Sequence, residues 1–415
     1  MKLIGPFTQL LPLSNLPERG PIADDALVCI TNAGLLIENG KIVAIDLYTK
    51  LLHNTKGAAI EHHELKGNFV CLPGFIDAHT HICFGGSRAR DYAMRNAGKT
   101  YLEIAQNGGG IWDTVTETRN ATTEILIANT IQRAQQHLTQ GTTTMEVKSG
   151  YGLSVNEELK MLRAIKKANA ISKTDLITTC LAAHMVPKDF AGTASEYLSH
   201  ITTSLLPKLK TEKLTNRIDA FVEQSAFSSS EITPYLIQAA QLDFDITVHA
   251  DQFSTGGSSV AIACNALSAD HLEASTPKEI KALAKSNVIG IALPGASLGL
   301  GCGFTPARKL LDAGGKLAIA SDHNPGSAPM GNLLAQAAIL GAFEKLTNAE
   351  VLAGITVRAA AALNLKDRGT LEKDKKADFT LFETSHYNEI LYQQGSLTPA
   401  MVFKNGSLVF KKNNT

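Results

Sequence analysis

Eight short apolar runs alternate with helix-like segments through the middle of the chain. They lie at residues 70–79, 142–148, 175–184, 218–223, 245–250, 266–271, 287–293 and 317–322. Such almost continuously apolar runs are typical of parallel strands that are buried on both faces. Between two of them Ile127, Ile131 and Leu138 recur at helical spacing, and Ser154 with Glu157 forms an S-x-x-E helix start. The pattern predicts an α/β fold, a (β/α)8 TIM barrel.

An open, doubly wound sheet is the alternative architecture for the same pattern. That fold commonly opens on a G-x-G-x-x-G turn after its first strand. The first predicted unit has no such segment. The barrel is therefore the favoured architecture.

Both ends of the chain carry strand patterns of another kind. These short runs lie at residues 26–31, 34–37 and 41–47 and again at 377–382, 399–404 and 407–410. Asn39-Gly40 and Asn405-Gly406 each separate the last two runs of a set, and Asn-Gly favours a tight hairpin turn. Because isolated hairpins are marginally stable, we expect the two ends to pair into one small β-sandwich domain. The predicted domains are residues 1–68 with 370–415, and a barrel over 69–369.

Composition and charge narrow the function classes. The chain has 415 residues, 44% of them hydrophobic, and its 39 Lys and Arg equal its 39 Asp and Glu. This balance favours neither a nucleic acid nor a charged partner. The six cysteines include no C-x-x-C pair, the N-terminus has no signal-peptide pattern, and no run approaches the roughly 18 apolar residues of a membrane span. We expect a cytoplasmic protein that makes no contact with membranes.

Residues 82–120 interrupt the barrel pattern. The segment has no clear core period and contains glycine pairs together with several arginines and aromatic residues. A loop of this length in a compact domain is usually functional or disordered. We interpret it as a loop that follows the first barrel strand and covers the substrate.

Polar residues follow most of the predicted strands, at the end of the barrel where active sites lie. In chain order they are His79, His81, Glu146, Lys148, Tyr151, His184, Glu223, Gln224, His249, Asp251, Gln252, Asp270, His271, Asp322, His323 and Asn324. His323 follows Asp322 and should point away from it, and Asp251, which is adjacent to Gln252, should likewise point to the other face of its strand. The histidines outside this set are expected to be solvated, namely His53, His62, His63, His137, His200 and His386.

The histidines indicate metal-assisted hydrolysis. His79 and His81 lie two residues apart, so on a strand both imidazoles project from one face. Three neutral imidazoles and one carboxylate suit a divalent metal and leave a position open for water. Such an ion lowers the pKa of its water from 15.7 to about 7. Asp322 could then accept the proton, and His271 could hold the water or polarise the carbonyl group.

Longer motifs resemble a known family. PGFIDAHTH, the histidines of strands five and six and the aspartate of strand eight resemble the amidohydrolase superfamily, whose members have a metal-bearing barrel and a small β-domain built from both chain ends. YLEIAQNGGGI, EVKSGYGL, AAHMVP, HADQF and SDHNPGSAPM are similar to the imidazolonepropionase family within it. The resemblance implies hydrolytic opening of 4-imidazolone-5-propanoate to N-formimidoyl-L-glutamate, the third step of histidine breakdown. It also suggests a homodimer.

The resemblance also implies residue roles. The metal ligands would be His79, His81, His249 and Asp322, around one zinc or iron ion per subunit. Substrate would contact Arg88, Tyr151 and His184, product would contact Asn324, Gly326 and Ser327, and His271 would lie near the metal-bound water. Some family members carry a glutamate where this chain has Gln252. Because an amide cannot accept a proton in that role, Gln252 is expected to orient substrate, and proton transfer falls to Asp322 with His271 assisting.

Two alternatives stay open. A metal-dependent deaminase of a cyclic amidine or purine uses a similar ligand set, but it commonly needs a glutamate near the histidine of strand five, where this chain has Gln252. A non-catalytic relative that binds no metal is disfavoured because all four ligands are present. Strand four contains no lysine that could bridge two metals, so one ion is the simpler interpretation.

Overall fold

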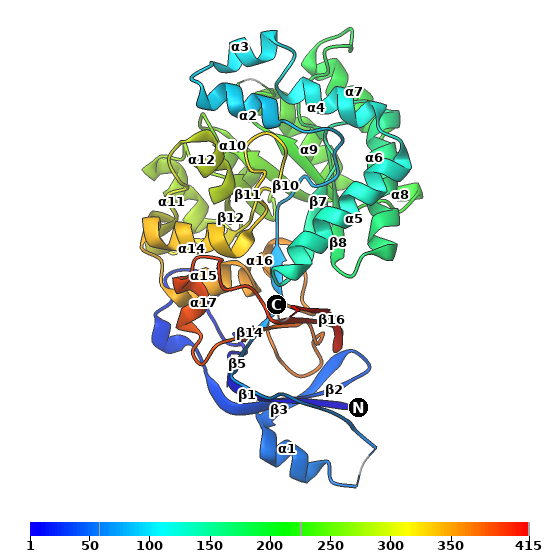
Figure 1. The fold of residues 1–415 in the computed structure, drawn as a ribbon. Coiled ribbons are helices and arrows are strands. Elements are labelled where there is room, and N and C mark those ends of the chain that lie inside the picture. Colours follow the sequence, from blue (N-terminus) through cyan, green and yellow to red (C-terminus); the bar gives the residue numbers. More distant parts are fainter. Residues whose placement is uncertain (58, 225, 414–415) are drawn as a thin grey trace.

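The protein consists of a barrel surrounded by helices and a β-sheet that carries both chain ends (Figure 1). The structure is a computed structural model that describes residues 1–57, 59–224 and 226–413, except for the side chains of residues 101, 102 and 105. The predicted fold class is confirmed. Within the described residues no helix is long and apolar enough to cross a membrane.

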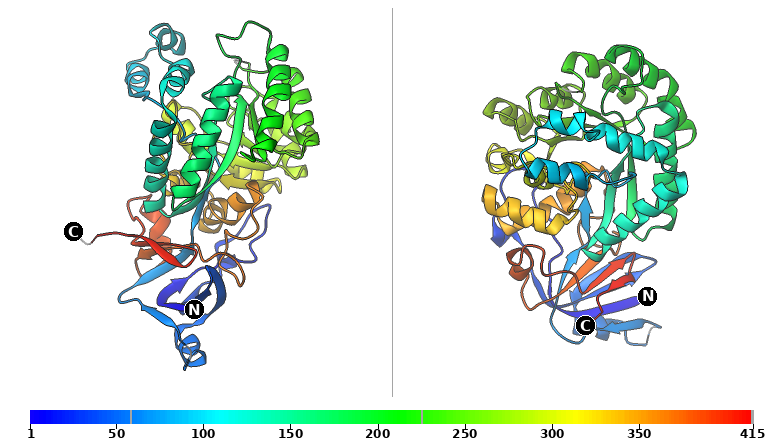
Figure 2. Two further views of the ribbon diagram at one scale, coloured as in Figure 1. Left: turned by 90° about the vertical axis from the view of Figure 1, so that its right-hand side faces the viewer. Right: turned by 45° about the horizontal axis from the view of Figure 1, so that its top comes forward.

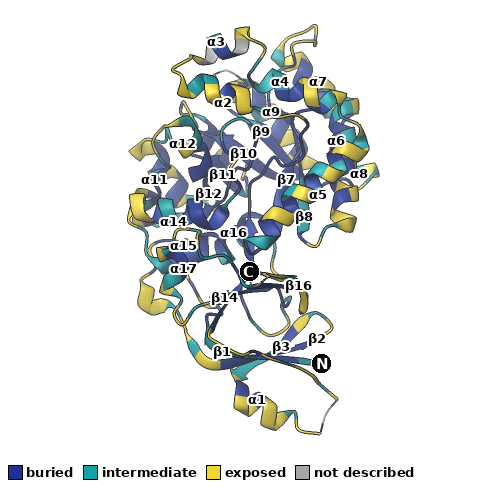
Figure 3. Ribbon diagram, in the orientation of Figure 1, coloured by how far each residue is buried: buried dark blue, intermediate teal, exposed yellow. Residues whose placement is uncertain are grey.

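The barrel has eight strands, and each pairs in parallel with the next along the chain. They are β6 (Phe75–Asp77), β7 (Thr142–Lys148), β8 (Asp175–Ala183), β9 (Arg217–Phe221), β10 (Asp245–Ala250), β11 (Ser268–His271), β12 (Ile289–Ala292) and β13 (Lys316–Ile319). The barrel strands form a dark blue, buried centre, whereas many outward-facing helix positions are exposed (Figure 3). The apolar runs therefore reflect burial on both faces.

Backbone hydrogen bonds close the barrel between its first and last strands. The Asp322 N–H donates to the His79 carbonyl at 3.0 Å, and the His81 N–H donates to the His323 carbonyl at 2.9 Å. This seam places residues separated by more than two hundred positions side by side. The first and last polar positions of the barrel consequently meet at one point.

Helices surround the barrel (Figure 2). They are α5 (Thr123–Thr139), α6 (Val155–Ile171), α7 (Ala194–Ser204), α8 (Leu206–Thr211), α9 (Ser229–Gln241), α10 (Gly257–Ala263), α11 (Pro277–Lys285), α12 (Pro294–Leu300), α13 (Ala307–Asp312), α14 (Leu333–Glu344), α15 (Asn348–Gly354) and α16 (Val357–Ala362). As the sequence predicts, Ser154 caps α6 by accepting from the Glu157 N–H at 3.4 Å.

Strands from both chain ends form a separate sheet in the order β16-β15-β14-β5-β1-β2-β3, with β4 added beside β1. Their bounds are β1 (Lys2–Leu10), β2 (Ile30–Glu38), β3 (Lys41–Leu47), β4 (Glu61–Glu64), β5 (Phe69–Pro73), β14 (Phe379–Glu383), β15 (Met401–Lys404) and β16 (Ser407–Lys411), with α1 (Tyr48–Asn54) and α17 (Asn388–Tyr392) nearby. Both Asn-Gly pairs have positive φ at each residue, as a tight hairpin requires. The strand expected at 26–31 is wrong for residues 26–29, because a 3-10 turn (Asp24–Ala26) precedes β2, which begins only at Ile30 and also contains the run predicted at 34–37.

The strand predicted over residues 70–79 is two strands in different sheets. β5 pairs with β1 and β14, whereas β6 pairs with β7 in the barrel. Gly74 separates them, and a Cβ there would lie 2.3 Å from the Thr143 hydroxyl oxygen. Both strands are buried and, apart from Asp77 at the end of β6, apolar, so hydrophobicity alone could not locate this break.

Residues 82–120 are not a continuous loop. They form α2 (Ala89–Asn96), α3 (Tyr101–Gln106) and α4 (Ile111–Asn120), which lie over the end of the barrel opposite the terminal sheet (Figures 1 and 2). The helices are short, and many of their positions are exposed or half-buried, so they show little core periodicity. As predicted, the segment nevertheless covers the mouth of the barrel, although as three helices and not as a loop.

Candidate active site

Four polar side chains meet at the closing seam of the barrel. His79 Nε2 lies 3.1 Å from His81 Nε2, which lies 3.3 Å from His249 Nε2. Asp322 Oδ1 lies 3.5 Å from both His79 Nε2 and His81 Nε2. A tetrahedral ion with bonds of about 2.1 Å separates its ligand atoms by about 3.4 Å. The spacing of these side chains fits one such ion.

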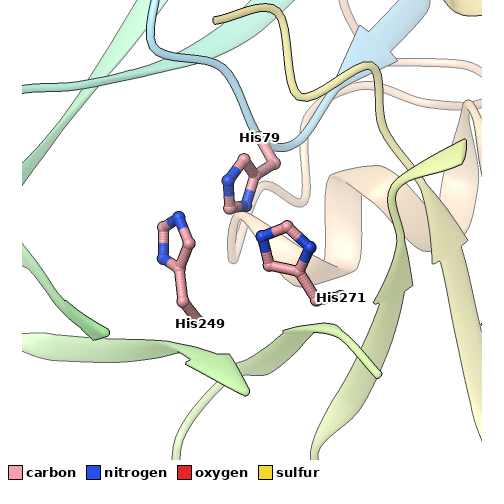
Figure 4. Close-up of side chains that lie close together, drawn as sticks. All are labelled: His79, His249 and His271. Carbon is pink, nitrogen blue, oxygen red and sulfur yellow. The ribbon is translucent and has the colours of Figure 1, made fainter. Parts of the chain in front are cut away.

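His271 points toward the same place from β11. Figure 4 shows its ring facing His79 and His249, and one nitrogen from each of the three rings lies within 4.8 Å of the others. The other side of its ring is 3.4 Å from Glu273. His271 has a positive φ of 89°, a backbone conformation that non-glycine residues rarely adopt and that is enriched at functional sites.

Two carboxylates orient the histidines. His79 Nδ1 lies 2.6 Å from Asp270 Oδ2, and His249 Nδ1 lies 2.9 Å from Asp219 Oδ2. Each Nδ1–H can therefore donate to a carboxylate, which leaves Nε2 as a lone-pair donor directed at the centre. Burial lowers the pKa of His79 well below its usual range and that of His249 to about 3. Neutral rings of this kind are suitable metal ligands.

A buried lysine links these carboxylates. Lys148 Nζ lies 2.7 Å from Glu146, 2.7 Å from Asp219 and 3.7 Å from Asp270. All four side chains are fully buried. Burial acts against the charge of Lys148, but the surrounding carboxylates raise its pKa above the usual value, so it is an ammonium ion.

A cavity of about 280 Å³ opens above the histidine cluster. The residues that the sequence predicts as substrate contacts all line it, namely Arg88, Tyr151, His184, Gln252, Asn324, Gly326 and Ser327. The ring of Tyr151 is 5.6 Å from that of His184, whose Nδ1 lies 2.9 Å from the Gly150 carbonyl oxygen. Burial raises the pKa of Tyr151, so its hydroxyl stays a hydrogen-bond donor.

Cationic side chains of the 82–120 segment line one wall of this cavity. Arg88 donates through Nε to Asp91, which also accepts from the Gly110 N–H at 2.8 Å. Asp91 therefore fixes the direction of the Arg88 guanidinium. Arg95 lines the same wall and donates to the carbonyl groups of Gly299 at 2.7 Å and Gly326 at 2.9 Å. No pattern in the sequence distinguishes Arg95 from a surface arginine.

The loop after β13 is ordered by Asn324. Its Oδ1 accepts from the N–H groups of Gly326 and Ser327, both at 2.8 Å. Its Nδ2 donates to the Asp322 carbonyl at 2.8 Å. The Asn324 amide thus shapes the loop, and the side chain of Ser327 and the surface of Gly326 face the cavity.

Several polar residues at the strand ends have other partners. Asp251 accepts from the N–H groups of Gly256 and Ser258, at 3.0 and 3.1 Å, and Glu223 accepts from two N–H groups of the loop after β10. These carboxylates hold loops, and Asp251 faces away from the centre as expected.

The prediction that His137 is solvated is wrong. His137 is 1% exposed, and its Nε2 lies 2.9 Å from His323 Nδ1. His137 lies on the inner face of α5, which packs against the loop after β13. The pair supports His323 on the side of the seam away from the four converging side chains.

Comparison with known sequences gives the class that the fold and site define. Residues 70–409 match the family described as the amidohydrolase family. Among similar proteins, imidazolonepropionase of Bdellovibrio bacteriovorus is 38% identical over 94% of this chain and 91% of its own, and that of Fusobacterium nucleatum is 39% identical over 94% of each chain. Imidazolonepropionase of Yersinia enterocolitica is 37% identical over 91% of this chain and 93% of its own.

The chain belongs to the amidohydrolase family and, within it, to the imidazolonepropionases. Solved structures agree on the fold. A triazine hydrolase variant superposes with a TM-score of 0.73 at 16% identity, covering 99% of this chain and 94% of its own. A Xanthomonas campestris adenosine deaminase with bound zinc gives a TM-score of 0.72 at 19% identity, covering 99% and 93%. These distant likenesses concern the fold alone.

Proposed function

We propose that this protein hydrolyses the cyclic amide C–N bond of 4-imidazolone-5-propanoate to give N-formimidoyl-L-glutamate. Its imidazolonepropionase relatives, similar over nearly the whole chain, support this reaction. The observation that carries the proposal is the convergence of His79, His81, His249 and Asp322 beneath a cavity walled by arginines. We expect the protein to work on a small molecule as a homodimer in the cytoplasm.

The donor set fits one divalent metal ion. His79, His81, His249 and Asp322 would hold it, because the ring nitrogens are neutral and the ligand spacing matches a tetrahedron. The imidazole and carboxylate donors suit zinc or iron. When bound, the ion would lower the pKa of a water ligand from 15.7 to about 7 and so provide a nucleophile at neutral pH.

Side chains of the chain itself would place the substrate. Arg88 is held by Asp91 and lines the cavity, so its remaining N–H groups can bind the propionate carboxylate of the substrate. Tyr151 and His184 lie together on the cavity wall. The Tyr151 hydroxyl can donate to the ring carbonyl, whereas His184, whose Nδ1–H donates to the Gly150 carbonyl, can accept a ring N–H through Nε2. Gln252 can orient the ring through its amide group but cannot accept a proton.

Asp322 would accept the proton of the attacking water. Its Oδ1 lies 3.5 Å from both His79 Nε2 and His81 Nε2, so it would lie beside a water molecule held by the ion. His271, on the other side of the cluster, would hold the water or polarise the carbonyl group and then support transfer of the proton to the leaving nitrogen.

The test is turnover of enzymatically generated imidazolonepropionate. Loss of the ultraviolet absorbance of the substrate is followed on a sample whose metal content is measured, and ammonia is assayed in parallel. Substrate loss without ammonia supports ring hydrolysis. Release of ammonia from a cyclic amidine or purine, with no loss of imidazolonepropionate, would make the protein a deaminase instead.

A further inference from the structure

One lysine inside the barrel contacts carboxylates from three strands. Lys148 lies at the end of β7, and its Nζ reaches Glu146 on the same strand, Asp219 on β9 and Asp270 on β11. Arg217 adds a second cation 3.6 Å from Glu146. Buried charges are costly unless paired, so a cluster of this kind requires a compensating role or close complementarity.

The carboxylates that Lys148 contacts are those that orient the metal-site histidines. Asp219 lies against His249 of β10, and Asp270 lies against His79 just beyond β6. We propose that Lys148 is a positioning residue, whose ammonium group fixes Asp219 and Asp270 together and thereby sets the orientation of two metal ligands from different strands. The inference rests on the proposed metal site.

The geometry argues against other roles for Lys148. A lysine that bridges metals does so after its nitrogen becomes neutral and reacts with carbon dioxide. Here Nζ is surrounded by three carboxylates that hold the proton, and a further anion among them would be repelled. Thr179 and Arg217 also contact Glu146, so the nearby cation is already paired with a carboxylate.

The charge of Lys148 is needed to keep the carboxylates in place. Asp219 and Asp270 are both fully buried and act on each other as like charges. Without the ammonium group the two carboxylates would repel each other and move apart, and this movement alters the hydrogen bonds to His249 and His79. Loss of a group that orients a metal ligand typically weakens metal binding about 10–100-fold.

The experiment replaces Lys148 with methionine, which is similar in size and carries no charge. Metal-free wild type and Lys148→Met are titrated with Co²⁺ against a competing chelator, and the visible spectrum of the Co²⁺-loaded protein is recorded. We expect affinity to fall about 10–100-fold and the Co²⁺ bands to change shape, because the ligand geometry changes. A role in stability alone would leave both the affinity and the bands unchanged.

Lys404→Met is the matched control. Lys404 is also a buried lysine between two carboxylates, Asp175 and Asp378, but it lies in β15 of the terminal sheet. Its replacement should lower the melting temperature and leave Co²⁺ affinity and spectrum unchanged. Equal losses of Co²⁺ affinity in the two variants would overturn the positioning role.

Folding of the variants is checked by circular dichroism. If Lys148→Met does not fold, Lys148→Gln, which keeps a hydrogen-bond donor without the charge, is measured in its place. Wild-type affinity and spectrum in the folded variant overturn the inference. So does failure of both Lys148 variants to fold while Lys404→Met folds, since Lys148 is then a requirement of the core. Failure of the wild type to bind Co²⁺ instead refutes the proposed metal site.

Discussion

Two buried lysines of this protein sit in similar charge clusters at opposite ends of the barrel. Lys148 pairs with Glu146 and Asp219 inside the barrel, and Lys404 pairs with Asp175 and Asp378 where the terminal sheet meets it. The difference lies in what the carboxylates touch next. Asp219 also contacts His249 of the site, whereas Asp175 also pairs with Arg368 at 2.5 Å and with Lys376 at 3.3 Å.

Exposure also separates the two clusters. Every charged group around Lys148 is at most 5% exposed, whereas the Asp175 side chain is 33% exposed. Water relieves the desolvation of Asp175, so its ion pairs can add net stability by tying β15 and the segment after α16 to β8. The Lys148 cluster has no such relief, and its geometry serves the histidines above it. Similar ion pairs therefore have different roles: those of Asp175 stabilise the attachment of the terminal sheet, and those of Lys148 position the histidines.

The largest expected effect comes from breaking the active-site side of this comparison. In His249→Ala, one ligand and the partner of Asp219 are lost together. We expect bound metal to fall to background and activity to fall at least ~10³-fold, because the pKa of the water stays near 15.7. Metal analysis and turnover are measured on one sample. The control is His200→Ala, which replaces an exposed histidine and should keep both the bound metal and the activity. Full turnover by His249→Ala would remove His249 from the ligand set.

Arg88→Ala tests the cavity wall without touching the metal side. A charge-assisted hydrogen bond to a carboxylate contributes about 1.5–3 kcal/mol, so kcat/KM should fall about 10–150-fold while metal content is retained. Arg90→Ala is the matched control, because Arg90 is exposed in α2, the helix that begins directly after Arg88. An unchanged kcat/KM in Arg88→Ala would mean that the propionate is bound elsewhere, with Arg95 the next candidate.

The sequence predicted the parts of the molecule that repeat a local pattern. The buried strands of the barrel and the two Asn-Gly hairpins follow from residues close together in the chain. His79 and His81 were recognisable because a two-residue spacing on a strand fixes a common face. Their meeting with Asp322 depended only on barrel closure, which the eight-unit pattern already implies.

Features that depend on partners across the barrel could not be predicted. Lys148 and Asp270 are recognisable as polar residues at predicted strand ends, but no local pattern shows that they contact each other. Nothing in the sequence distinguishes Asp219 from other strand residues. His137 looks like a surface helix residue until α5 is packed against the loop that carries His323. At the break, the Thr143 side chain leaves no room for a Cβ on residue 74, and this contact cannot be inferred from the local sequence.

Asp175→Asn weakens the second cluster by a smaller amount. The amide keeps the size of the side chain but loses its ion pairs with Lys404, Arg368 and Lys376. Since Asp175 is partly exposed and Lys404 keeps Asp378, we expect a loss of about 1–2 kcal/mol in the free energy of unfolding. Urea unfolding of the metal-free protein measures it. Metal affinity should stay at the wild-type value, and a fall in it would mean that the two clusters are coupled.

The smallest effect is the pH dependence of this second cluster. Burial acts to raise the pKa of Asp175, but Lys404 and Arg368 hold it well below its usual value. A carboxyl group whose pKa is lower in the folded state stabilises fully above its unfolded pKa of about 3.9, and this contribution is lost as the pH falls through the folded pKa. The stability difference between wild type and Asp175→Asn should therefore be constant from about pH 7 to pH 5 and shrink below about pH 4. Melting both metal-free proteins across this range tests the prediction, and a difference that stays constant down to the lowest pH at which both fold would show that the charge of Asp175 contributes nothing to the attachment of the terminal sheet.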